Sequence, residues 1–306
     1  MTILFKRSQK NYSIMIIVSL NNSKKLAKSV AKSLNTEYGI IEINSFPDGE
    51  LHMRYDCDVK NKKVVIVESM QPDPTQALLN SIFASNTAKD LGCRKVIFVT
   101  PYIAYMRQDK RFNEGEAINA KIMAKLINEN FDKIITIDPH LHRIKKMRDI
   151  FKIASKNLTA NLEIADFVEN KFKNPVIVGP DWESYQWAEV IAKKINVNCT
   201  VLEKDRHSYR NVDVEMTKKI DIENKEVIIV DDIISTGNTM IKASKVAKKL
   251  KAKKVIAIGV HGLFVENAIN KMKKHFDGIY TCDSIVNKNS KISLTNVICK
   301  ELKKEL

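Results

Sequence analysis

Short apolar runs alternate with amphipathic stretches along most of the chain. The runs are rich in valine and isoleucine, which is typical of strands buried in a parallel sheet. Between them, apolar residues recur three and four positions apart, as on one face of a helix. This alternation predicts an α/β fold with mostly parallel sheets flanked by helices. The expected strands are Met15–Val18, Val64–Glu68, Val96–Thr100, Ile134–Ile137, Val176–Val178, Thr200–Leu202, Val227–Val230 and Val255–Val260, and the expected helices include Thr75–Leu91, Ala117–Asn128, Tyr185–Ile195 and Thr239–Leu250.

The same rhythm runs through both halves of the 306-residue chain. This length suits two domains of about 150 residues each. Because the pattern breaks within Phe151–Asn161, we expect a first domain at residues 13–155 and a second at residues 156–306. No sequence repeat is strong enough to prove duplication, and no low-complexity linker separates the halves. We therefore predict two domains of one architecture that pack together.

Composition narrows the class of protein. With 44% hydrophobic residues the chain can build real cores, which excludes a disordered protein. The five cysteines lie far apart and lack the spacing of a zinc site, which favours a reducing compartment, and we expect the cytoplasm. No stretch approaches the ~20 apolar residues of a membrane span, and the first apolar run is too short for a signal peptide. We expect no membrane partner.

The net charge of +15 changes this picture little. A basic surplus could attract nucleic acid or small anionic substrates. However, the lysines occur in many small groups on the polar faces of candidate helices, which indicates a solvated surface. No helix-turn-helix or zinc pattern accompanies them. We therefore expect no nucleic-acid partner.

The stretch VIIVDDIISTGNT, residues Val227–Thr239, carries the strongest chemical signal. A buried strand, a small hydroxylic loop and the start of a helix together form a phosphate cradle. Two carboxylates beside it would repel a bare phosphate, but they can accept hydrogen bonds from the hydroxyls of an attached sugar. An alternative is purely structural: the acids end a strand and a hydroxyl caps a helix. The candidate sugar-phosphate ligands are Asp231, Asp232, Ser235, Thr236, Gly237 and Thr239.

Two segments of the first half could bind a nucleotide. Residues Phe46–Glu50 read FPDGE, which alone predicts a tight turn before a strand at Leu51–Tyr55. Arg107, Gln108 and Asp109 follow a predicted strand, where α/β proteins usually bind ligands. The guanidinium of Arg107 could stack on a purine or pair with phosphate oxygens. A surface loop is an equally good interpretation of Arg107 alone.

Acids and cations follow three other predicted strands. Asp138 and His140 could bind a divalent cation or contact a polyphosphate, or they could form a surface turn. Asp181 could hold a sugar or a metal, or cap the next helix. Lys204 and Arg206 would be part of a solvated loop if taken alone. Paired cations are also what a transferring phosphoryl group needs.

Together these motifs resemble the ribose-phosphate pyrophosphokinase (PRPP synthetase) family, from about Ile14 to the C-terminus. VIIVDDIISTGNT resembles the phosphoribosyl-diphosphate-binding loop of the type I phosphoribosyltransferase fold. FPDGE matches a hallmark of the PRPP synthetases, and PYIAYMRQD resembles their PYxxYxRQD segment. The resemblance implies two tandem type I phosphoribosyltransferase-like domains, each a mostly parallel sheet flanked by helices.

The resemblance also implies a Mg²⁺-dependent enzyme that makes 5-phosphoribosyl 1-diphosphate and AMP from ATP and ribose 5-phosphate. It implies a homo-oligomer based on a dimer, with a hexamer as the larger form, in which FPDGE reaches the nucleotide of a neighbouring subunit. It assigns ATP to Phe46, Asp48, Glu50, Arg107, Gln108 and Asp109, ribose 5-phosphate to Asp181 and the Val227–Thr239 residues named above, catalysis to Lys204, Arg206 and His140, and the metal to Asp138, His140 and Asp181.

Two alternatives share parts of this pattern. A phosphoribosyltransferase would contain the Val227–Thr239 string but has no need for the FPDGE and RQD segments. A catalytically silent regulatory subunit is suggested by Asn238 and Glu183, which stand where relatives commonly have glycine, and by Ala117, which stands where proline is usual. The presence of every candidate cation and acid named above favours the enzyme.

Overall fold

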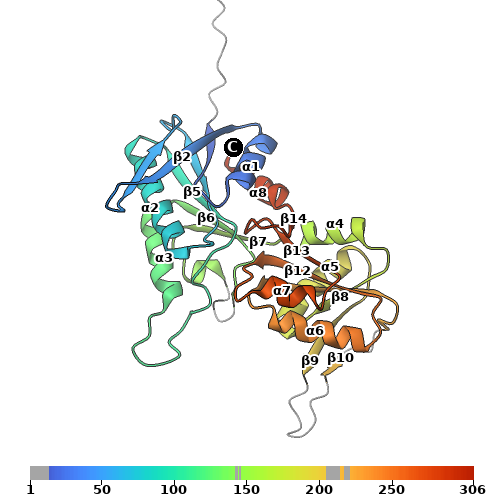
Figure 1. Cartoon of the computed structure of the whole chain (residues 1–306). Coiled ribbons are helices and arrows are strands. Elements are labelled where there is room, and N and C mark those ends of the chain that lie inside the picture. The colour runs from blue at the N-terminus through green and yellow to red at the C-terminus, as the bar shows by residue number, and fades with distance from the viewer. Residues whose placement is uncertain (1–13, 142–143, 145, 205–213, 217–220) are drawn as a thin grey trace, which may run out of the picture.

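The computed structural model describes residues 14–141, 144, 146–204, 214–216 and 221–306. Two seven-stranded sheets with flanking helices lie side by side (Figure 1). The first has the order β3-β2-β1-β4-β5-β6-β7 and the second the order β10-β9-β8-β11-β12-β13-β14. In each sheet only the edge hairpin, β2–β3 or β9–β10, is antiparallel. The predicted α/β class with mostly parallel sheets is confirmed.

The strands and helices have the following bounds. The strands are β1 (Met15–Ser19), β2 (Glu37–Ser45), β3 (Leu51–Tyr55), β4 (Lys63–Val67), β5 (Lys95–Thr100), β6 (Lys133–Ile137), β7 (Ala154–Leu158), β8 (Pro175–Gly179), β9 (Cys199–Lys204), β10 (Val214–Met216), β11 (Glu226–Ile234), β12 (Lys254–Gly262), β13 (Gly278–Cys282) and β14 (Ser290–Ile292). The α-helices are α1 (Lys24–Leu34), α2 (Pro74–Asp90), α3 (Asn119–Asn130), α4 (Asn161–Lys171), α5 (Trp182–Lys194), α6 (Asn238–Lys249), α7 (Ala268–Lys273) and α8 (Thr295–Leu302).

The two sheets repeat one another strand for strand. In the first, Val64 of β4 pairs with Val96 of β5, and in the second, Val227 of β11 pairs with Val255 of β12. Val96 of β5 is thus equivalent to Val255 of β12. Tyr102, beyond β5, and His261, within β12, lie the same number of positions after these two valines and are therefore equivalent as well. Their rings meet edge to face with centroids 5.0 Å apart, so the equivalent strand ends of the two halves face each other. The structure thus shows the common architecture that the sequence pattern predicted.

An aspartate marks the same position in both halves, buried in the first and half-buried in the second. Asp138 follows β6, and its carboxylate accepts a hydrogen bond from the N–H of Ala160, just beyond β7 (2.8 Å). Asp283 follows β13, and its carboxylate accepts one from the N–H of Leu294, just beyond β14 (2.8 Å). Burial raises the pKa of Asp138 to about 6 and also raises that of Asp283. Each aspartate therefore fastens the seventh strand of its sheet to the sixth.

The C-terminus returns to the first half of the molecule. Helix α8 lies beside α1, and Cys299 packs into the core that α1 shares with it (Figure 1). The ammonium of Lys133 on β6 pairs with the carboxylates of Glu301 (2.9 Å) and Glu305 (3.0 Å). A continuous apolar core and these charges join the two halves. The predicted domain boundary at residues 155 and 156 falls within β7 and stays a proposal.

Among the predicted strands, the largest error in a strand end is that of β11. The sequence pattern ended this strand at Val230, whereas β11 continues to Ile234 because it keeps pairing with β12 as far as Gly262 after its other neighbour, β8, has ended. None of the helices in the described part of the chain is both long enough and apolar enough to cross a membrane.

Candidate active site

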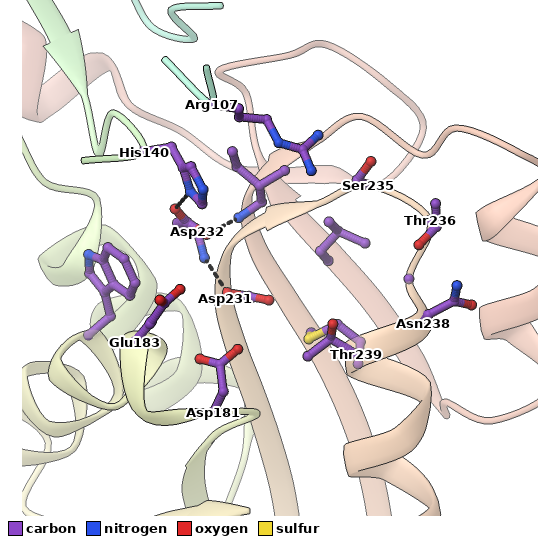
Figure 2. Close-up of a pocket in the computed structure, with 15 residues that line it drawn as sticks. Arg107, His140, Asp181, Glu183, Asp231, Asp232, Ser235, Thr236, Asn238 and Thr239 are labelled. Carbon is purple, nitrogen blue, oxygen red and sulfur yellow. Dashed lines mark hydrogen bonds and ion pairs between the residues drawn. The ribbon is translucent and has the colours of Figure 1, made fainter. Parts of the chain in front are cut away.

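A cavity of about 250 Å³ lies where β8 and β11 end, and both halves of the molecule line it (Figure 2). The second half contributes Asp181, Asp231 and Asp232 and the loop between β11 and α6. The first half contributes Arg107 and His140. These are residues that the sequence motifs singled out, brought together from four separate strand ends.

The loop before α6 leaves the start of that helix open. Gly237 is the residue before the helix, with φ 76°, and no side chain caps the helix. A Cβ on Gly237 would lie 2.7 Å from the sulfur of Met272, so both the backbone conformation and the packing require glycine. Unpaired N–H groups at a helix start favour an anion. The loop residues that line the cavity are Ser235, Thr236, Gly237, Asn238 and Thr239.

Asn238 does not take the place of a left-handed glycine. It is the first residue of α6, and the left-handed conformation belongs to its neighbour Gly237. The exposed side chain of Asn238 lies at the cavity edge (Figure 2). Asparagine at this position therefore needs no special backbone freedom.

Two adjacent acids, Asp231 and Asp232, have opposite electrostatic states. Burial, with the negative charges of Asp232 and Asp181, raises the pKa of Asp231 well above its usual value. Burial alone would raise the pKa of Asp232, but the hydrogen bond with His140 and the charge of that ring outweigh it and lower the pKa. Asp231 thus has negative neighbours that disfavour its ionised form, whereas His140 favours the ionised form of Asp232.

This partner of Asp232 comes from the other half of the molecule. Nδ1 of His140 lies 2.8 Å from Oδ2 of Asp232. Because the ionised carboxylate can only accept, Nδ1–H is the donor. Asp232 is also fixed by its own loop, since its Oδ1 accepts from the N–H of Ile233 (2.7 Å). The pair holds the imidazole against the cavity and ties β6 to β11.

Asp181 has the structural role that sequence left open, and it also reaches the cavity. It is the N-cap of α5, with its carboxylate accepting from the N–H (3.0 Å) and the hydroxyl (2.6 Å) of Ser184. The same carboxylate points toward Asp231 (Figure 2). Glu183 and Trp187, from the first turns of α5, also line the cavity. No sequence signal marked Trp187.

The first two residues of the RQD segment have different positions: Arg107 lines the cavity, whereas Gln108 does not. Arg107 is exposed, and its guanidinium points toward the loop that carries Ser235 (Figure 2). Gln108 instead braces the loop before α3, accepting from Asn119 (2.5 Å) and donating to Glu116 (3.4 Å). Neither Gln108 nor Asp109 is among the described residues that line the cavity.

The FPDGE turn lies apart from this cavity. It connects β2 to the edge strand β3, and its ends are joined by a hydrogen bond from the N–H of Phe46 to the carbonyl of Glu50 (2.8 Å). The side chain of Phe46 is 49% exposed, and Asp48 and Glu50 are exposed as well. The turn was correctly predicted, and its contact with a nucleotide stays a prediction.

Of the expected catalytic cations, the structure describes only the backbone of Lys204. It is the last residue of β9 and pairs with Val214 of β10. Arg206 lies outside the described residues. Both catalytic assignments therefore stay predictions.

Two of the described acids that line the cavity, Asp181 and Asp231, could contribute to a magnesium site. Within the described ranges, no three His, Cys, Asp or Glu residues lie close enough together to form a metal site by themselves. Asp138 is 4% exposed, bonds to backbone and does not line the cavity, so the geometry gives its predicted metal role no support. Asp181 and Asp231 supply carboxylate oxygens beside an open space. Mg²⁺ commonly binds through one or two carboxylates, water and substrate phosphates.

Comparisons with known proteins agree with this geometry. Residues 15–130 match the family model of the N-terminal domain of ribose phosphate pyrophosphokinase, and residues 152–295 match that of the phosphoribosyl transferase domain. The solved phosphoribosylpyrophosphate synthetase of Mycobacterium smegmatis has the same fold, with a TM-score of 0.81 over 95% of this chain and 98% of that one at 21% identity.

Two curated relatives cover most of the chain. The ribose-phosphate pyrophosphokinase of Methanobrevibacter smithii is 35% identical over 301 residues, which is 94% of this chain and 100% of the relative. That of Pyrococcus furiosus is 34% identical over 255 residues, which is 83% of this chain and 89% of the relative. The two domain models follow one another along the chain in the order of the two sheets. This chain belongs to the ribose-phosphate pyrophosphokinase family.

Proposed function

We propose that the chain transfers the diphosphate of ATP to the 1-hydroxyl of ribose 5-phosphate, giving 5-phosphoribosyl 1-diphosphate and AMP. The observation that carries this proposal is the cavity at the end of β11. There an open helix start and the Asp231 side chain from one half line the same cavity as a histidine and an arginine from the other. A phosphorylated sugar and a polyphosphate could thus meet between the halves.

Ribose 5-phosphate would bind to the second half. Its phosphate would accept hydrogen bonds from the loop Ser235–Thr239 and from the start of α6. Its hydroxyls would donate to Asp231, whose carboxylate faces the cavity. Asp232 would act mainly by holding His140, because its own oxygens already accept from that ring and from Ile233. A phosphoribosyltransferase is less well supported, because Arg107 and His140 come from a domain that such an enzyme does not need.

ATP would bind from the side of the first half. Arg107 would contact the phosphates or stack on the base, and His140 would contact the phosphates. The exposed turn with Phe46, Asp48 and Glu50 would complete the site of a neighbouring subunit, as its position outside its own cavity suggests. The active unit would then be at least a dimer. Gln108 would support this side by bracing the loop, and Asp109 remains a candidate contact.

Mg²⁺ would be held by Asp181 and Asp231 together with the substrate phosphates. When bound, it would neutralise phosphate charge and align the displacement. The chain's own residues would orient the anomeric hydroxyl toward the β-phosphorus and surround the transferring group with positive charge. Lys204 and Arg206 would add to that charge. Since all five cysteines are free thiols, a reducing compartment such as the cytoplasm is the proposed location.

Activity of one variant tests the catalytic assignment of Lys204. Purified protein with ATP, Mg²⁺ and ribose 5-phosphate should release AMP, and Lys204→Ala should lower the rate on the order of 100-fold or more, as is typical when a transition-state cation or donor is removed. Lys194→Ala, at the exposed end of α5, is the control and should keep full activity. Equal rates for Lys204→Ala and Lys194→Ala would contradict the catalytic role of Lys204.

A further inference from the structure

A second cavity, of about 630 Å³, lies between the halves and away from the candidate active site. The first half lines it with Asn21 and Asn22, which follow β1, and with Gln71, which follows β4. The second half lines it with residues 262–264, at the end of β12, and residues 285–289, which follow β13. Ligand pockets in proteins commonly have volumes of roughly 300–1,000 Å³.

This cavity is the counterpart of the candidate active site in the internal repeat. The active site uses the ends of β8 and β11 of the second half together with the ends of β5 and β6 of the first. The second cavity uses the ends of β1 and β4 of the first half together with the ends of β12 and β13 of the second. Since the sheets share one strand order, these are the same four strand ends with the halves exchanged.

The acids that follow the equivalent strands β4 and β11 differ in their hydrogen bonding and in whether they face a cavity. Glu68 and Ser69 follow the apolar run of β4 as Asp231 and Asp232 follow that of β11. The carboxylate of Glu68 is buried and accepts from the N–H of Asn22 at 3.0 and 3.2 Å. The carboxylate is thus engaged within its own half, where Asp231 faces open space. A sugar diol would find no carboxylate there.

The equivalent helix start is also closed. Helix α2 follows β4 as α6 follows β11, and Asp73 caps it, with its carboxylate accepting from the N–H of Gln76 (3.0 Å). A side chain of the protein therefore occupies the place that a ligand phosphate would take at α6. The second cavity does not bind ribose 5-phosphate in the manner proposed for the first.

The second cavity also differs in charge from the candidate active site, whose lining contains several carboxylates. No carboxylate is among the second cavity's described lining residues, which include the exposed lysines Lys273 and Lys288. Side-chain amides of Asn21, Asn22, Gln71 and Asn289 supply donors and acceptors, and Phe264, Ile269, Ile285 and Val286 supply an apolar wall. Two positive charges match one phosphate group, which carries about −1.5 to −2 at neutral pH. Amides match the polar edge of a base, and the apolar wall matches its face.

We propose that this second cavity binds a nucleoside monophosphate without a divalent cation. The described lining offers a divalent cation no negatively charged ligand, while the lysines can neutralise the phosphate directly. Because the lining comes from both halves, the bound nucleotide would bridge them at a seam separate from the catalytic one.

Counting bound nucleotide tests this proposal. With EDTA present, equilibrium dialysis of labelled AMP should show one more AMP per chain for the wild type than for Lys273→Glu or Lys288→Glu. Lys274→Glu makes the same charge change one residue beyond Lys273 and outside the cavity, and should bind as the wild type does. These lysines are exposed, and equal melting temperatures would verify that the variants fold.

Three results would overturn the proposal: the same AMP count in wild type and in both lining variants, the same loss in Lys274→Glu, or displacement of the additional AMP by an equal concentration of inorganic phosphate. The last would mean that the base is not recognised. The test is independent of the proposed reaction, because Lys273→Glu leaves the active site unaltered and should form product at the wild-type rate. A wild type that makes no product would count against the reaction without changing the AMP count.

Discussion

The two halves of this molecule have the same sheet and use it differently. At the end of β11, Asp231 faces a cavity and the start of α6 is open; at the end of β4, Glu68 is bonded to its own half and the start of α2 is closed by Asp73. The strand order is the same in both sheets. The difference teaches that chemistry in this fold depends on whether the groups at the strand ends are left for a ligand or engaged by the protein.

Replacing equivalent acids should give the sharpest contrast. We expect Asp231→Asn to lower product formation on the order of 100-fold, because it removes charge that faces the reacting sugar. Glu68→Gln should leave kcat within a few-fold of the wild type. Steady-state kinetics with ribose 5-phosphate and ATP measures both. Comparable losses in the two variants would mean that Glu68 at the end of β4 matters for catalysis as much as Asp231 does.

The same glutamate should make stability depend on pH. Burial raises the pKa of Glu68 from 4.5 to about 8 in the folded protein. The folded state therefore binds this proton more tightly than the unfolded state, and the stability it contributes below pH 4.5 is lost as the pH rises to about 8. The loss is on the order of 5 kcal/mol.

Urea unfolding across this pH range would measure the effect. Glu68→Gln should flatten the decline of the unfolding free energy, while Glu114→Gln, at an exposed position, should follow the wild type. Parallel curves for Glu68→Gln and wild type would show that the carboxyl titrates alike in both states.

Alanine variants of two glycines distinguish the effect of backbone strain from that of a steric clash. We expect Gly237→Ala to cost about 3 kcal/mol and to raise the KM for ribose 5-phosphate, because its Cβ would both adopt a positive φ and meet Met272 at 2.7 Å. Gly115→Ala, with φ 82° and open space around its Cβ, should cost about 1 kcal/mol and leave KM unchanged. A KM that rises equally in both variants would contradict the phosphate role of the Gly237 loop.

The paired aspartates Asp138 and Asp283 should give the smallest contrast. Each accepts the same backbone hydrogen bond, so Asp138→Asn and Asp283→Asn should each lower the unfolding free energy by about 1–2 kcal/mol. The apparent affinity for Mg²⁺, from activity titrations, should stay alike in the two variants. A selective loss of Mg²⁺ affinity in Asp138→Asn would restore its predicted metal role.

Sequence reasoning located the buried strands because their apolar runs are continuous, as in Val64–Val67. It missed β7, whose ASKNL sequence buries only Leu158, and β2, whose polar residues interrupt the pattern. It also did not list α1, although the buried residues of that helix recur at helical spacing. The sequence identified Asp181 and gave capping and ligand binding as alternatives, whereas the structure shows that this residue both caps a helix and lines the cavity.

Contacts between distant residues were beyond sequence pattern alone. The bond between His140 and Asp232 joins residues 92 positions apart in the two halves. The second cavity is lined by ordinary asparagines and lysines, and only the internal repeat of the fold brings them together. Motifs identified the residues with chemistry, whereas the topology decides which of them face the same space.

The most direct test of the central claim is to identify the products by ³¹P NMR. A reaction of the purified protein with ATP, Mg²⁺ and ribose 5-phosphate should convert ATP to AMP while a sugar-linked diphosphate appears in equal amount, and Asp231→Asn should do so far more slowly. Formation of ADP or free phosphate in place of AMP, or no change in the spectrum of the wild-type reaction, would contradict diphosphate transfer at this site.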